Sequence, residues 1–188
     1  MNRFSGRPFA TAGGIDSIAE MLPMQLLFLL LLLVGPFLII TVLSYANRRF
    51  NLPLPTRARI GLTLFFLFTG IGHFIRTEPM AAMLPSSIPY RVELIYLTGV
   101  FELAGAVGVW IPKLMKITGV CLIVMMLAVL PANIYSALNR VEFGGHEHGP
   151  IYLLLRVPFQ LFVIGWIYFA TAQPYRRGRR MTQTIDTN

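Results

Sequence analysis

Charged residues are scarce in this sequence, and acidic residues are the scarcest. Only 13% of the 188 residues are charged, with eight Asp or Glu against sixteen Lys or Arg. A soluble domain typically has about 25% charged residues, so a water-soluble domain is not expected. The single cysteine, Cys121, excludes an intrachain disulfide and a CxxC redox centre. The net charge of +8 does not indicate nucleic acid, because the basic residues form small clusters beside apolar segments and no single face.

The sequence contains several long apolar runs. Residues 24–43 carry no charge, and about 20 apolar residues span the roughly 30 Å hydrocarbon core of a bilayer. Because backbone groups in lipid must be satisfied internally, each run is predicted to be a helix. The sequence therefore predicts an all-α integral membrane helical bundle with five transmembrane helices, at 24–44, 59–75, 91–111, 115–138 and 150–172.

The ends of the chain differ from the apolar part. Residues 1–23 and the basic tail 173–188 are polar segments outside the bundle. Ser44-Tyr45-Ala46 could be a signal-peptidase site, but the preceding run exceeds the usual 7–15 residues of a signal peptide. We therefore expect the helix at 24–44 to be retained as an extra transmembrane helix before a four-helix domain at 58–172.

The basic residues predict an orientation. The connections 44–59 and 112–116 and the tail together carry ten Lys and Arg, whereas the N-terminus and the connections 76–91 and 139–149 carry five. Cytoplasmic segments are enriched in Lys and Arg. We expect a multi-pass protein of the bacterial inner (plasma) membrane, with the N-terminus outside and the C-terminus in the cytoplasm.

Five polar residues lie inside the predicted helices and form the candidate ligand-binding cluster. A charge at bilayer depth costs at least about 2.5–3.5 kcal/mol on insertion scales, so such residues usually face a partner or a cavity. At about 1.5 Å per residue, all five fall in the outer half of the membrane. Arg156 and Glu102 are predicted to form an ion pair. The cluster consists of His73, Glu102, Asn133, Arg156 and Gln160.

These five residues could instead have a purely structural role. Buried polar side chains also join membrane helices, and Glu102 with Arg156 could fix helix register. The glycines of the second and third segments indicate close helix packing. His146 and His148 are expected in a solvated outer loop that titrates near neutral pH, and no metal site is expected because further ligands are missing nearby.

Several short motifs resemble the DoxX-like family of small bacterial membrane proteins. Along residues 58–172 the chain reads GIGHF, AAMLPSSIP, LIYLTGVFELAGAVGVWIP, LPANIYSAL and LRVPFQLFVIGW, in an order and spacing similar to that family. The resemblance implies a four-helix core and a link to membrane redox processes, some of them involving quinones. The residues that match recurring polar and proline positions of the family are His73, Glu102, Pro131, Asn133, Arg156, Pro158 and Gln160.

Three functions fit these observations. The first is an accessory or small-ligand binding subunit that holds a quinone-like head group, with no other cofactor expected. The second is an intramembrane enzyme that uses Glu102 and His73 as acid and base on a lipid-like substrate. The third is a small permease. Expected partners are the lipid bilayer and either a membrane redox protein or a second copy of the chain, and no nucleic acid.

Overall fold

The described part of the chain is built from helices. The computed structural model describes residues 24–47 and 51–172, and no β-strand occurs among them. The all-α class is therefore confirmed for these residues, whereas 1–23, the tail 173–188 and residues 48–50 of the first connection lie outside them. The elements are α2 (Met24–Ala46), α3 (Leu54–Ile75), α4 (Thr77–Ala82), α5 (Arg91–Gly108), α6 (Met115–Leu138), the 3-10 helix η2 (His146–Tyr152) and α7 (Leu153–Ala172).

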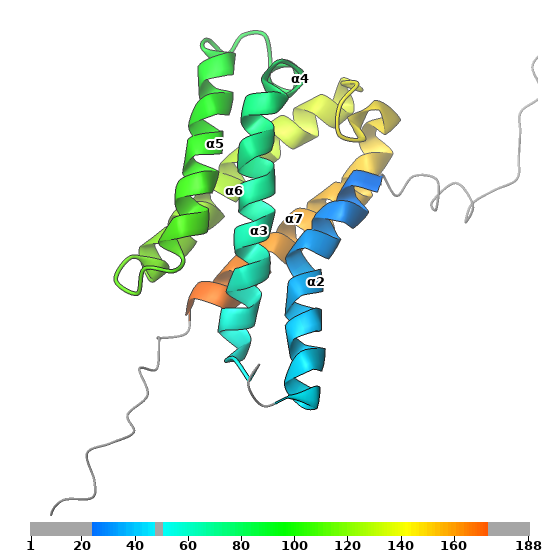
Figure 1. The fold of residues 1–188 in the computed structure, drawn as a ribbon. Coiled ribbons are helices and arrows are strands. Elements are labelled where there is room, and N and C mark those ends of the chain that lie inside the picture. Colours follow the sequence, from blue (N-terminus) through cyan, green and yellow to red (C-terminus); the bar gives the residue numbers. More distant parts are fainter. Residues whose placement is uncertain (1–23, 48–50, 173–188) are drawn as a thin grey trace, which may run out of the picture.

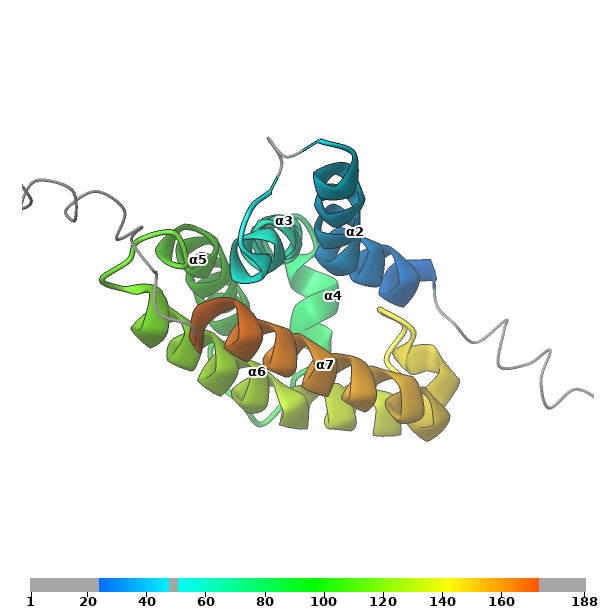
Figure 2. The same ribbon diagram turned by 90° about the horizontal axis from the view of Figure 1, so that it is seen from below.

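The long helices form two layers. Helices α2, α3 and α5 lie side by side in one layer, and the antiparallel pair α6 and α7 forms the other (Figures 1 and 2). Helix α3 is central, since it contacts α2, α5 and α7. The fully or nearly buried apolar side chains gather between the layers: Leu33, Ala58, Leu62, Phe65, Phe66, Ala106, Val109, Leu122, Val163, Ile167 and Ala170.

Helix α3 is longer than the sequence predicts. We expected it to begin near residue 59, but it begins at Leu54 and has 22 residues, because Pro53 caps it and Pro55 lies in its first turn. Proline suits this turn, where its missing N–H leaves no helical hydrogen bond unmade. The extension brings Arg57 into the helix, where its guanidinium donates to the Leu52 carbonyl (2.8 Å) and to Thr41 Oγ1 (3.0 Å). Arg57 thus ties the start of α3 to α2.

Gly61 lies where the backbones of α2 and α3 approach each other closely. A Cβ atom added to Gly61 would lie 1.9 Å from the carbonyl oxygen of Leu33, whose side chain is fully buried. Any side chain at this position would therefore force the two backbones apart. The predicted extra helix is thus an integral part of the packed bundle.

Within residues 24–47 and 51–172, four helices are long and apolar enough to cross a membrane. They are α2, α3, α6 and the helical stretch His148–Ala172. The third predicted segment, 91–111, is the exception, because the 18 residues of its helix α5 include three charged residues, Arg91, Glu93 and Glu102. A fifth span stays a prediction.

Two connections are more ordered than the sequence predicts. The proline-rich loop after α3 contains the short helix α4, in which Pro79 occupies the first turn and so displaces no helical hydrogen bond. The predicted helix at 150–172 begins at Leu153 and follows the 3-10 helix η2. Both connections lie at the end of the bundle opposite the α5–α6 connection (Figure 1).

Candidate functional site

The first polar pair joins α3 and α5. His73 Nε2 in the last turn of α3 lies 3.6 Å from Glu102 Oε1, and their side chains are only 13% and 6% exposed. Glycines permit this approach, because a Cβ atom added to Gly99 would lie 2.8 Å from the Cβ atom of His73. A Cβ atom added to Gly70 would come within 3.3 Å of the Glu102 side chain. The prediction that these glycines serve close packing is confirmed.

The second polar pair joins α6 and α7. Asn133 Nδ2 donates to Gln160 Oε1 at 3.1 Å, and both residues are buried. The Gln160 amide in turn donates to the backbone carbonyl of Met126. Met126 lies beside Leu127, whose carbonyl lacks a helical donor because Pro131 has no N–H. A side chain of α7 therefore satisfies a backbone group of α6 near the proline.

Arg156 does not form the predicted ion pair with Glu102. It lies in the first turn of α7, and Glu102 is paired with His73 instead. The prediction matched the two residues by depth along the membrane normal, but depth does not decide which helices are neighbours. Helix α7 packs against α6 and α3, whereas α5 makes its largest contact with α3. Four of the five predicted residues thus form two pairs, and no ion pair or hydrogen bond between described residues joins Arg156 to either pair.

Unpartnered polar atoms distinguish four of these five residues. His73 Nδ1, Glu102 Oε2, Asn133 Oδ1 and Arg156 Nε are each buried, and none has a hydrogen-bond partner among the described residues. A buried polar atom left without a partner costs about 1–3 kcal/mol. Such atoms in native proteins usually contact a water, an ion or a ligand. Together they offer the Arg156 donor, two oxygen acceptors and one imidazole nitrogen.

The histidines of the connection between α6 and α7 have different surroundings. His146 is only 2% exposed, and its ring packs edge-on against Tyr152 with 4.9 Å between ring centroids. The expectation of a solvated loop is therefore wrong for His146, although His148 is exposed. Among the described residues no group of three or more His, Cys, Asp or Glu side chains could hold a metal ion.

Comparison with known proteins assigns the chain to a family. The model of the family described as Domain of unknown function (DUF8561) matches residues 62–171. The chain belongs to this family. No curated protein and no solved structure matches the chain. The DUF8561 region covers most of α3 and runs almost to the end of α7, so it contains both polar pairs and Arg156, while α2 lies outside it. The resemblance to the DoxX-like family stays a prediction.

Proposed function

We propose that this DUF8561 protein is a membrane-spanning accessory subunit that binds a small amphipathic ligand with a quinone-like head group. The four unpartnered buried polar atoms carry the proposal. The resemblance to DoxX-like proteins, with their redox associations, supports the ligand class. The chain has one cysteine and therefore no CxxC centre that could pass electrons to the ligand. The bound ligand would instead exchange electrons with a partner redox protein in the membrane.

Insertion into a bilayer is supported by the surface of the bundle. Large apolar side chains are exposed on α2, α6 and α7, for example Ile39 (61%), Val124 (58%) and Leu161 (57%). Soluble proteins rarely expose contiguous apolar surface on this scale. With α5 as a fifth span, the predicted orientation places both polar pairs in the outer half of the bacterial inner membrane.

The polar groups match the chemistry of a quinone and its reduced form. Quinone carbonyls accept hydrogen bonds, and the Arg156 guanidinium is a permanent donor. The hydroxyls of the reduced form donate, and Glu102 Oε2 and Asn133 Oδ1 are buried acceptors without partners among the described residues. His73 Nδ1 can donate or accept according to its tautomer. The cluster therefore offers donors and acceptors that suit both redox forms of a quinone-like head group.

An intramembrane enzyme is the second candidate. The contact between His73 and Glu102 favours it, because a carboxylate beside an imidazole can move a proton to or from a bound substrate. This function would need the same buried side chains and a reaction at the ligand. Conversion of the bound molecule therefore separates the enzyme from the binding subunit.

Replacement of Arg156 tests the proposed function. Native mass spectrometry compares the full-length protein, extracted gently from its own membrane, with its Arg156→Met variant. We expect a quinone-like molecule on the wild-type protein and at least about tenfold lower occupancy in the variant, because a hydrogen bond to a charged donor is lost.

Arg76→Met is the matched control. Arg76 is exposed at the end of α3, outside both polar pairs, so its replacement should leave ligand occupancy unchanged. Thermal unfolding in detergent shows whether each variant is folded. A folded wild-type protein that carries no ligand, even after incubation with a short-chain quinone, would contradict the proposed function.

A further inference from the structure

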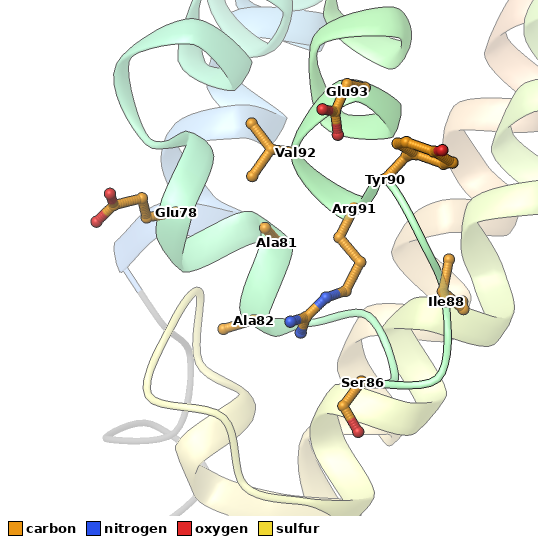
Figure 3. Close-up of a pocket in the computed structure, with 9 residues that line it drawn as sticks. All are labelled: Glu78, Ala81, Ala82, Ser86, Ile88, Tyr90, Arg91, Val92 and Glu93. Atoms are coloured by element: carbon orange, nitrogen blue, oxygen red, sulfur yellow. The ribbon is translucent and has the colours of Figure 1, made fainter.

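A pocket opens at the end of the bundle where α4 lies beside the start of α5. Its volume is about 560 Å³, within the range of about 300–1,000 Å³ typical of ligand sites. Figure 3 shows its lining, which comes from α4, from the connection after it and from the first turn of α5. None of the five residues of the buried polar cluster lines this pocket. It is therefore a separate candidate site.

Charges of both signs line the pocket. The side chain of Arg91 extends into the space between α4 and the loop at Ser86, whereas Glu78 and Glu93 point in other directions (Figure 3). Among the described residues, no ion pair or hydrogen bond engages the Arg91 guanidinium. The cation and the two carboxylates thus line one pocket without neutralising one another directly.

The walls and the position of the pocket indicate an amphipathic ligand. Apolar side chains, among them Ile88 and Val92, line the pocket together with the charged groups. Tyr90, at the entrance to α5, is 75% exposed. Exposed tyrosines are enriched where membrane proteins meet lipid head groups. At the end of a spanning bundle, this pocket would lie at the depth of those head groups.

We propose that this pocket binds the head group of a zwitterionic phospholipid of the phosphoethanolamine class. Arg91 would hold the phosphate with its planar, forked donors. The ammonium would meet the carboxylate of Glu78 or Glu93, while the apolar walls contact the glycerol end. A purely anionic lipid fits less well, because the two carboxylates would repel it. The proposal rests on the membrane insertion proposed above but not on any ligand at the buried cluster.

Lipid titrations of the full-length protein in detergent test this site. Native mass spectrometry measures the binding of phosphatidylethanolamine, phosphatidylglycerol and inorganic phosphate to wild-type protein, to Arg91→Gln and to Glu78→Gln/Glu93→Gln. We expect wild type to prefer phosphatidylethanolamine, Arg91→Gln to bind it at least about tenfold more weakly, and the double variant to lose the preference over phosphatidylglycerol. Arg76→Gln, which removes a nearby exposed arginine outside the pocket, should bind like wild type.

Three results would overturn the proposal. They are equal binding of the two lipids by wild type, unchanged binding in folded Arg91→Gln, and inorganic phosphate that binds as tightly as the lipid. Because none of these readouts involves a quinone, the proposal and the proposed function can fail independently. Thermal unfolding confirms that each variant is folded before it is compared.

Discussion

At the scale of single residues, the buried carboxylate of Glu102 is only half satisfied. One oxygen faces His73 at 3.6 Å, while the other has no partner among the described residues. The neighbouring helix supplies a glycine surface at this point, and glycine offers no side chain to complete the contact. Glu102 therefore has the hydrogen-bonding capacity for one further group, which the proposed ligand would supply.

Glu102→Gln separates the binding subunit from the enzyme. The substitution keeps the size of the side chain and removes its charge, so packing against α3 should persist. We expect occupancy by a quinone-like ligand to fall about tenfold, because a charged acceptor is lost, and the ligand recovered from wild type to be chemically unchanged. Native mass spectrometry and chromatography of the extracted ligand measure the two quantities.

Glu142→Gln is the control for this variant, since Glu142 is exposed in the connection between α6 and η2. It should bind ligand as wild type does. Conversion of the ligand by wild type, abolished in Glu102→Gln although the ligand still binds, would contradict the binding subunit and support the enzyme.

At the scale of the helices, the sequence predicts the positions of the apolar segments well. It predicts less well which helices contact one another. The predicted bounds of α6 agree with the structure, because its apolar run lies between two turns and its one charged residue, Lys116, is in the first helical turn. The start of α3 was misplaced because Arg57 and Arg59 interrupt the apolar pattern, yet both are only 6% exposed and lie within the helix. Depth placed Arg156 near Glu102, but helix adjacency depends on three-dimensional packing that one sequence does not display.

Gly61 offers a test of the contact between α2 and α3. We expect Gly61→Ala to destabilise the bundle by about 1–3 kcal/mol through overpacking, because the new Cβ atom would lie 1.9 Å from the Leu33 carbonyl oxygen. Thermal unfolding of the detergent-solubilised protein measures the effect. The expected result is a lower midpoint of unfolding than that of wild type.

Gly165→Ala provides the matched control, since a Cβ atom there would meet nothing within 4 Å. Alanine favours a helix over glycine by about 1 kcal/mol, so this variant should be as stable as wild type or more so. Equal unfolding midpoints for the two alanine variants would show that α2 does not pack on α3 as described.

At the scale of the whole molecule, the helices run in alternate directions, so the two ends of the bundle differ in chemistry. One end carries the start of α3 and the α5–α6 connection, and the other carries α4, η2 and the pocket with Arg91 (Figure 1). The predicted orientation follows from the distribution of basic residues. It holds only if α5 crosses the membrane, because a helix that returned to the same side would reverse every element after it.

Cysteine labelling on the two sides of α5 tests this crossing. In a Cys121→Ser background, Ser87→Cys precedes α5 and Lys113→Cys follows it, and both native side chains are exposed. We expect a membrane-impermeant maleimide to label Ser87→Cys in intact spheroplasts and to label Lys113→Cys only after permeabilisation. Labelling of both variants before permeabilisation would mean that α5 does not span, and the reverse pattern would mean that the bundle is inverted. In either case the two polar pairs would not share the outer half of the membrane. In the inverted bundle the proposed ligand would have to be reached from the cytoplasmic side.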